Sequence, residues 1–254
     1  MKYAVVTGAS SGIGADFARN LSARGYGLIL VARREDRLKT LAAELSTPVE
    51  IFTADLSRRE ECERLGEFMD KFEIGVFINN AGFGDCGAFT ESDLGKELQM
   101  INVNINALHV LSKIALKHLQ KNSEKAYLLN VGSSAGLLPA GPYMATYYAT
   151  KAYVVSLSRA IAQELKETKS NVSVSVLCPG PVKTEFNDVA NVSFTLPGIE
   201  PKFCADYAIA QLFNKKTVII PGLFMKLTNM FSHIIPAKLA IKITGMQQKK
   251  KLSK

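Results

Sequence analysis

Short apolar runs alternate with longer amphipathic segments along most of the chain, and no other feature limits the possible folds as strongly. The apolar runs are expected to be strands at Tyr3–Thr7, Gly27–Ala32, Val49–Thr53, Val76–Asn79, Tyr127–Val131, Val172–Leu177 and Thr217–Ile220. The segments between them are expected to be helices at Gly12–Arg24, Arg34–Glu44, Arg58–Lys71, Leu94–Gln120 and Tyr147–Lys169. Nearly continuous apolar strands that alternate with helices are typical of a parallel sheet covered on both faces. The sequence therefore predicts an α/β fold, with one domain over residues 1–254 and a doubly wound parallel sheet of about seven strands.

A glycine-rich turn follows the first expected strand. Within Thr7–Gly14, the glycines Gly8, Gly12 and Gly14 lie between a buried strand and the start of a helix. Glycines there permit close approach of a pyrophosphate, and the helix N-terminus supplies free N–H groups and the positive end of its dipole. A tight connection alone can also require glycines. We predict a dinucleotide site, which also includes Ser10, Ser11 and Ile13.

Tyr147 and Lys151 lie four residues apart in an expected helix, so the phenol and the ammonium group share one face. A phenol ordinarily titrates near pH ~10, and a cation beside it lowers that pKa. We therefore expect the pair to exchange a proton near neutral pH. The same spacing occurs by chance in many helices, so its weight comes from the glycine turn.

Further segments, taken in chain order, resemble the motifs of the short-chain dehydrogenase/reductase family. The turn has the spacing G-x-x-x-G-x-G, Asn79–Gly82 matches N-N-A-G, and Pro179–Thr184 matches P-G-x-V-x-T. The single residues that match are Asp55, Asn104, Ser133, Tyr147 and Lys151. The resemblance covers about residues 1–185 and is closest to the branch of 3-ketoacyl reductases and hydroxysteroid dehydrogenases. It implies a Rossmann fold.

The resemblance also implies a role for each matching residue. Tyr147 would be the general acid or base, Ser133 would hold the carbonyl oxygen, and Lys151 would bind the nicotinamide ribose. Asn104 would hold a water that links Lys151 to solvent. Beyond the glycine turn, the implied cofactor contacts are Asp55, Asn80, Ala81, Gly82, Tyr147, Lys151, Pro179, Gly180, Val182 and Thr184.

Two of these assignments have close competitors in the sequence. The family's usual spacing to the tyrosine points to Ser134, whereas alignment on Gly136 selects Ser133, which we favour. Tyr148 is adjacent to Tyr147, but only Tyr147 has the family's spacing to the lysine.

Charge at the end of the second expected strand bears on the cofactor. An acidic residue there would bind the adenosine 2′-hydroxyl of NAD, but this chain has Ala32 followed by Arg33 and Arg34. Guanidinium groups suit phosphate geometry. We therefore predict that NADP(H) is preferred over NAD(H), with Arg33 the main contact to the 2′-phosphate and Ser10 assisting. Alternatively, both arginines are only surface charges at a helix start.

Composition excludes several other classes of protein. Hydrophobic residues make up 47% and charged residues 21%, as in soluble globular proteins. No run of ~18 apolar residues suggests a membrane-spanning helix, and the first residues do not resemble a signal peptide. The four cysteines, Cys62, Cys86, Cys178 and Cys204, are far apart, and with three histidines they show no metal-ligand spacing. We expect no metal and a reducing, cytoplasmic location.

The last third of the chain departs from the alternating pattern. Residues 185–204 have no clear period, which is typical of a lid over a substrate site. Residues 222–254 form an amphipathic, basic extension ending in Lys249, Lys250, Lys251 and Lys254, and the whole chain carries +8. The extension could cover the substrate pocket, enter a subunit interface, or lie on an anionic membrane, the alternative we favour least. The basic end is most simply a solvated terminus, so no nucleic-acid partner is expected.

The function predicted is an NADPH-dependent oxidoreductase that reduces a ketone or aldehyde to an alcohol, or runs in reverse. Apolar residues in the lid and in the loop before Tyr147 indicate an apolar substrate: Phe186, Val189, Val192, Phe194, Leu196, Ile199, Leu137, Leu138, Pro139 and Met144. The alternative is an NADP(H)-binding sensor or scaffold without catalysis. The family resemblance implies a homodimer or homotetramer formed through Leu94–Gln120 and Tyr147–Lys169.

Overall fold

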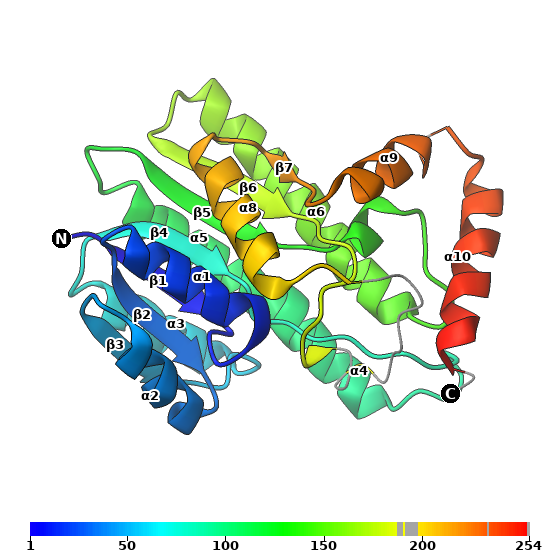
Figure 1. The fold of residues 1–254 in the computed structure, drawn as a ribbon, viewed down its shortest axis with the longest axis horizontal. Helices are drawn as coiled ribbons and strands as arrows, with labels where there is room; N and C mark the ends of the chain where they lie inside the picture. Colours follow the sequence, from blue (N-terminus) through cyan, green and yellow to red (C-terminus); the bar gives the residue numbers. More distant parts are fainter. Residues whose placement is uncertain (187–189, 191–197, 233, 253–254) are drawn as a thin grey trace.

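The computed structural model describes residues 1–186, 190, 198–232 and 234–252 (Figure 1). Within them, seven strands form one sheet in the order β3-β2-β1-β4-β5-β6-β7, and all neighbouring strands are parallel. The strands are β1 (Tyr3–Thr7), β2 (Gly27–Ala32), β3 (Val49–Thr53), β4 (Ile74–Asn79), β5 (Ala126–Val131), β6 (Val172–Leu177) and β7 (Val218–Ile219). The chain order reverses between β1 and β4, which is where open α/β sheets bind ligands. The predicted fold class is confirmed.

Helices cover both faces of the sheet. On one face lie α1 (Gly12–Ala23), α2 (Glu35–Glu44) and α8 (Pro201–Phe213). On the other face lie α3 (Arg59–Met69), α5 (Leu108–Leu119) and α6 (Ala145–Glu167). Ala4 and Val6 of β1 enter the first core cluster and Val5 enters the second. A strand buried on both faces has no position for a polar side chain facing water, which explains the continuous apolar runs.

The expected helix at Leu94–Gln120 is divided into three parts. These are α4 (Leu94–Ile101), a π-helical turn η1 (Asn102–Ala107), and α5. A π-helical turn contains more residues per turn than an α-helix and occurs often at functional sites. Asn104 lies within η1, so the irregular turn sets the direction of a predicted site residue.

Parts of the chain that follow β6 lie outside the layered core. Val182 pairs with Ile199 in an isolated parallel bridge, and α9 (Leu223–Ser232) and α10 (Ala237–Leu252) lie at the end of the molecule away from β2 and β3 (Figure 1). Half of the predicted lid at 185–204, residues 187–189 and 191–197, lies outside the described residues.

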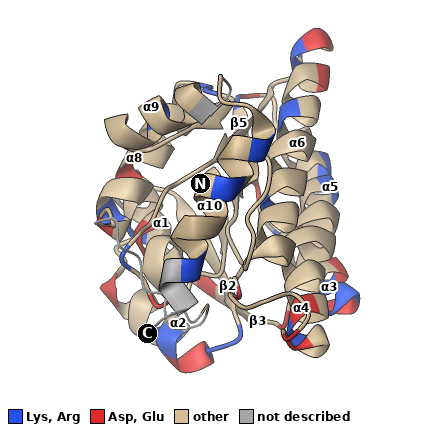
Figure 2. Cartoon of the chain, turned by 90° about the vertical axis from the view of Figure 1, so that its right-hand side faces the viewer, with Lys and Arg blue, Asp and Glu red and all other residues tan. Residues whose placement is uncertain are grey.

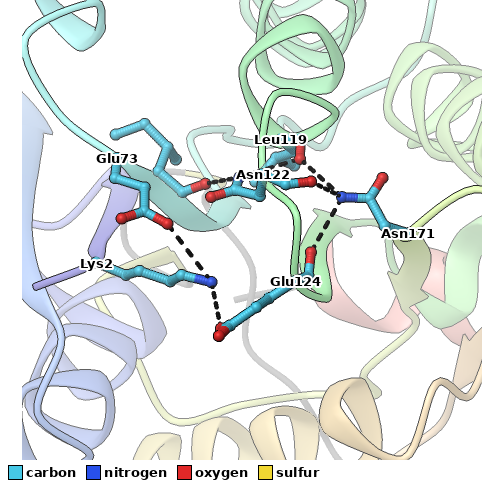
Figure 3. A network of polar contacts seen from close by, with 7 residues as sticks. Lys2, Glu73, Leu119, Asn122, Glu124 and Asn171 are labelled. Atoms are coloured by element: carbon cyan, nitrogen blue, oxygen red, sulfur yellow. Dashed lines mark hydrogen bonds and ion pairs between the residues drawn. The ribbon is translucent and has the colours of Figure 1, made fainter.

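A polar network connects the turns at the amino-terminal ends of the strands, at the edge of the sheet opposite the candidate site (Figure 3). Lys2 pairs with Glu124 at 2.7 Å and with Glu73 at 3.6 Å. Asn171 donates to the carbonyl oxygens of Asn122 at 2.6 Å and Glu124 at 3.0 Å. These contacts join the turns before β1, β4, β5 and β6. We therefore assign this edge to stability, because its polar groups bind one another.

The described residues contain neither a helix that could span a membrane nor a cluster that could hold a metal. None of the helices in this part of the chain combines the length and apolar character needed to cross a bilayer. In the same residues, no group of three or more His, Cys, Asp or Glu side chains is placed to hold a metal ion.

Candidate active site

The glycine turn after β1 has no room for larger side chains. Gly8 has φ +65°, and a Cβ on Gly14 would lie 2.2 Å from Gly8 O. The turn leads into α1, where the Ser11 side chain makes no capping hydrogen bond and the first turn carries no acid. The first N–H groups of α1 therefore keep no side-chain acceptor, and the positive end of the helix is uncompensated. A phosphate group fits this cradle.

The carboxyl ends of β1 and β4 are held together by Thr7. Its hydroxyl accepts hydrogen bonds from the backbone N–H groups of Asn80 at 2.9 Å and Ala81 at 3.0 Å. The Asn80 side chain donates back to Thr7 O at 2.9 Å. A Cβ on Gly8 would meet the Asn80 amide at 2.9 Å. Asn80 and Ala81 thus form the wall facing the glycine turn, and Thr7 is a positioning residue that the sequence analysis left out of the site.

The Asn104 side chain forms hydrogen bonds with the next segment of this wall. Its side chain accepts from Phe83 N at 3.1 Å and donates to Phe83 O at 2.9 Å and to Thr150 Oγ1 at 3.1 Å. A Cβ on Gly82 would lie 2.9 Å from Asn104 Oδ1 and 3.4 Å from Lys151 Nζ. The structure therefore brings Asn104, Gly82 and Lys151 together. Because the Asn104 side chain is already engaged, its predicted role in a water relay stays a prediction.

Ser133 and Tyr147 approach each other at the end of β5. Ser133 is the cap of a 3₁₀ turn, η2 (Ser134–Leu137), and its Oγ accepts from Ala135 N at 3.1 Å. Burial raises the pKa of Tyr147 to about 12, and a hydrogen bond with Ser133 opposes that rise. The backbone N–H of Ser134 donates to Pro179 O at 2.8 Å. Of the two candidate serines, the structure places Ser133 on the tyrosine.

Lys151 is buried near the ring of Tyr147. Its Nζ donates to Val131 O at 2.9 Å and lies 5.9 Å from the centre of the Tyr147 ring. Burial lowers the pKa of Lys151 to about 8. The expectation that Lys151 lowers the phenol pKa toward neutrality is wrong for this structure. The cation binds a carbonyl instead of the phenol, and desolvation determines the direction of both pKa shifts.

Arg34 reaches the glycine turn from the end of β2. Its guanidinium group donates to Ser10 Oγ at 3.1 Å and to Ser11 Oγ at 2.9 Å. Glu185 pairs with Arg34 at 3.1 Å and with Arg37 at 2.5 Å. The hydrogen bond from Arg37, and then that from Arg34, holds the pKa of Glu185 below its usual range. Arg33 is exposed. Its contact with a 2′-phosphate is not tested by this geometry and stays a prediction.

A hollow of about 770 Å³ opens beside this cluster, lined among others by Ser10, Gly12, Arg37, Thr184 and Glu185. The hollow joins the glycine turn to the segment that follows β6. Thr184 reaches the turn directly, since a Cβ on Gly12 would lie 3.0 Å from Thr184 Cγ2.

The other predicted cofactor residues lie around these groups. Val182 is buried beside its bridge to Ile199, and Gly180 lies against Met225 of α9. Asp55 Oδ1 accepts from the Ser57 hydroxyl at 2.9 Å, which fixes the carboxylate after β3. Ile13, on the first turn of α1, is half-buried against the core.

Apolar side chains enclose the outer face of Tyr147. Met100, Ala135, Met144, Tyr148 and Ala190 are buried with it, and Phe83, Cys86, Leu138 and Phe186 pack against them. The Phe186 ring lies 5.5 Å from the Tyr147 ring. The sequence identified Phe186 only as one apolar residue of a lid, and nothing in its spacing indicated contact with Tyr147.

The comparisons with known proteins agree with this geometry. The family model for short chain dehydrogenases matches residues 2–192. A very-long-chain 3-oxoacyl-CoA reductase of Neurospora crassa is 35% identical over 244 residues, covering 92% of this chain and 70% of that protein. A short-chain dehydrogenase from Sphingobium yanoikuyae, solved with NADPH, has a TM-score of 0.81 and 31% identity, covering 92% of this chain and 95% of that one. A short-chain dehydrogenase/reductase from Burkholderia phymatum, solved with NAD, has a TM-score of 0.83 and 25% identity, covering 92% and 93%.

Proposed function

This chain belongs to the short-chain dehydrogenase family, and we propose that it reduces an apolar ketone or aldehyde to an alcohol with NADPH, or catalyses the reverse oxidation. The observation that carries the proposal is the meeting of Ser133, Tyr147 and Lys151 beside Gly82 and the glycine turn. A proton donor, an oxygen-binding hydroxyl and a cation thus lie next to a cradle that fits a dinucleotide.

The residues present fit a nicotinamide nucleotide. The uncapped start of α1 suits the pyrophosphate, and the space at Gly8 and Gly14 admits no side chain that would displace it. Lys151 and Asn80 would hold the ribose end, and Thr184 closes the turn from the opposite side. Arg33, Arg34 and Arg37 make the adenosine end basic.

In the reduction, the bound cofactor supplies a hydride to the carbonyl carbon. Ser133 Oγ donates a hydrogen bond to the carbonyl oxygen as its negative charge grows, and Tyr147 Oη transfers its proton to that oxygen. The substrate gains one hydride and one proton, and the phenolate left on Tyr147 regains its proton from solvent. The Lys151 ammonium stabilises that phenolate by its charge. Because burial raises the Tyr147 pKa to about 12, the phenol is protonated and ready to act as the acid.

Preference for NADPH rests on charge. The last position of β2 and the two positions after it carry no acidic residue, since Ala32 is followed by Arg33 and Arg34. Arg34 is already directed at Ser10 and Ser11, and a 2′-phosphate would gain two guanidinium partners there. Relatives in the family have been solved with either nucleotide, so these residues carry the choice.

The apolar surroundings of Tyr147 support a substrate with a large apolar group beside its carbonyl. Met100, Met144 and Phe186 would pack against such a group. The Neurospora crassa relative is named as a reductase of very-long-chain 3-oxoacyl-CoA. A long-chain carbonyl compound is the substrate class that agrees with both observations.

A carbonyl panel tests the proposal against the alternative of a nucleotide-binding protein without catalysis. Purified protein is incubated with NADPH and short or long-chain ketones, and alcohol formation is measured together with NADPH binding. We expect alcohol from the longer apolar ketones. Tight NADPH binding with no alcohol from any ketone would favour the non-catalytic alternative. We also propose a homo-oligomer formed through α5 and α6, which sedimentation at several concentrations tests.

A further inference from the structure

Helix α9 presents an apolar stripe to solvent. Leu223, Phe224, Leu227, Met230 and Phe231 are all exposed, with Phe224 at 62% and Phe231 at 55%. At helical spacing these five positions lie within an arc of about 120°, the width that an amphipathic helix normally buries. Exposed apolar patches of this kind mark contact surfaces.

The opposite side of α9 is already packed on the protein, so the stripe has no partner within the described residues. A Cβ on Gly180 would lie 2.8 Å from Met225 Cγ, and Lys226 Nζ lies 5.2 Å from the centre of the Tyr207 ring. Rolling the helix to bury the stripe would break both contacts. The orientation of α9 is thus fixed with its apolar side outward.

The charge around the stripe has one sign. Residues 222–254 contain seven lysines and no aspartate or glutamate, and Figure 2 shows basic but no acidic positions on α9 and α10. Lys238 and Lys242 of α10 are exposed, as are the apolar Leu239 and Met246 of the same helix. Exposed apolar residues beside lysines without acids complement a surface of anionic headgroups over an apolar interior.

Helix α10 connects this surface to Tyr148, the neighbour of Tyr147. Gln248 Nε2 donates to Tyr148 Oη at 2.7 Å, and a Cβ on Gly245 would lie 3.2 Å from Pro142 Cγ. Ala240, Thr244 and Gln248 are buried against the rest of the protein. The inner face of α10 therefore packs on the loop before α6 and on Tyr148, the neighbour of Tyr147. A surface that binds α9 and α10 would consequently lie beside the substrate side of the site.

We propose that α9 and α10 dock on an anionic membrane, with the α9 stripe inserted at the headgroup level and the substrate side of the site facing the lipid. The inference rests on the proposed function in one respect, because a long-chain carbonyl substrate would be dissolved in that lipid. A second copy of this chain suits the stripe less well, since two surfaces that carry lysines and no acids would repel each other.

A tryptophan reporter tests insertion directly, because the chain contains no tryptophan. Phe224→Trp places the only indole on the stripe. Lys39→Trp places it instead on α2, at a side chain of similar exposure, 66%, at the end of the molecule opposite α9 and α10 (Figure 1). Full-length protein is titrated with vesicles of phosphatidylglycerol and phosphatidylcholine, and with phosphatidylcholine alone. We expect a blue shift and quenching by brominated lipid for the first variant with anionic vesicles, and neither for the second. No shift, or equal shifts for both variants, overturns the proposal.

Substitutions separate the apolar and charged contributions. The double variant Phe224→Ser, Phe231→Ser is expected to bind vesicles at least about tenfold more weakly. The reason is that two aromatic rings would no longer insert into the lipid. Lys238→Gln with Lys242→Gln is expected to weaken binding to anionic vesicles and leave the weak binding to neutral vesicles unchanged. Equal loss for both vesicle types in the lysine variant contradicts the charge argument.

Two further measurements keep the outcomes distinct. Reduction of a small, water-soluble ketone should be unchanged in the double serine variant, because none of its changes touches the site. A protein that reduces this ketone but binds no vesicles refutes the membrane inference and leaves the proposed function standing, whereas vesicle binding without reduction of any ketone refutes the function alone. Light scattering without vesicles that shows a dimer, converted to monomer by the serine variant, assigns the stripe to a second copy and overturns the proposal.

Discussion

Lys151 Nζ lies 5.9 Å from the centre of the Tyr147 ring and donates its hydrogen bond to Val131 O. The ammonium group is thus near enough to stabilise a phenolate by charge but does not bond to the phenol. Both groups are buried, and each pKa is displaced toward the neutral form: Tyr147 to about 12 and Lys151 to about 8. These directions agree with the proposed reduction, in which a neutral phenol would give up a proton and a nearby cation would stabilise the phenolate.

The buried lysine makes stability depend on pH. The Lys151 pKa is lower in the folded protein than the 10.5 of an exposed lysine, so folding releases a proton between those values. The cost of burying the cation is fully present below about pH 8 and is lost as the pH approaches 10.5. We therefore predict that the free energy of unfolding of wild type, relative to that of Lys151→Met, rises by roughly 2 kcal/mol between pH 7 and pH 10. Urea denaturation of both proteins at both pH values measures this. Both proteins contain Tyr147, so its contribution cancels from the difference between them. If the difference in free energy of unfolding were the same at both pH values, Lys151 would have the pKa of an exposed lysine.

Glu185 is predicted to compete with the 2′-phosphate of NADPH. Its carboxylate occupies the guanidinium groups of Arg34 and Arg37, so Glu185→Gln should release them and lower the KM for NADPH about fivefold, or about 1 kcal/mol. The KM for NADH should not change. Glu200→Gln is a matched control, because Glu200 forms a similar exposed pair with Lys183 of the same segment at 2.6 Å. A rise in KM for NADPH would show that Glu185 positions the arginines and does not compete.

Arg33 and Arg34 can be separated by their effect on cofactor choice. We predict that Arg33→Asp lowers the ratio of kcat/KM for NADPH to that for NADH by at least about tenfold, because a carboxylate repels the phosphate and accepts from a ribose hydroxyl. Arg34→Asp should have a smaller effect, since Arg34 already binds Ser10, Ser11 and Glu185. A larger effect at Arg34 would reverse the assignment, and unchanged ratios in both variants would remove it.

Gly14→Ala is predicted to abolish nucleotide binding. The new methyl group would lie 2.2 Å from Gly8 O, so the turn must open. Gly87→Ala is the control, because a Cβ there meets nothing within 4 Å. Calorimetric titration with NADPH should show no binding for the first variant and normal binding for the second. Unimpaired binding by Gly14→Ala would place the pyrophosphate elsewhere.

The layered core was predictable because its strands are buried on both faces and its helices on one. Burial enforces an apolar period that can be seen without a structure, as Val5 and Val6 of β1 show by entering opposite clusters. The glycine turn was predictable for a similar reason: Gly14 has no room for a side chain.

The features that were missed depend on contacts between distant segments. The π-helical turn around Asn104 leaves no periodic signal, because its neighbours are as apolar as those of a regular helix. Phe186 contacts Tyr147, which is 39 positions away in the sequence, and Gln248 donates to Tyr148, which is 100 positions away. Only the folded structure brings these residues together. The pKa shifts were misjudged because motif spacing shows that Lys151 is near Tyr147 but does not show that both are desolvated.

The proposed function depends above all on the transfer of a proton from Tyr147 to the carbonyl oxygen during reduction by NADPH. The most direct test is Tyr147→Phe, assayed with a long-chain ketone and NADPH deuterated at the transferred position, with Tyr148→Phe as the control. We predict deuterium at the carbinol carbon for wild type and Tyr148→Phe. For Tyr147→Phe we predict a loss of kcat of at least about a hundredfold, with NADPH binding retained. Undiminished transfer of deuterium by Tyr147→Phe would show that Tyr147 is not the proton donor.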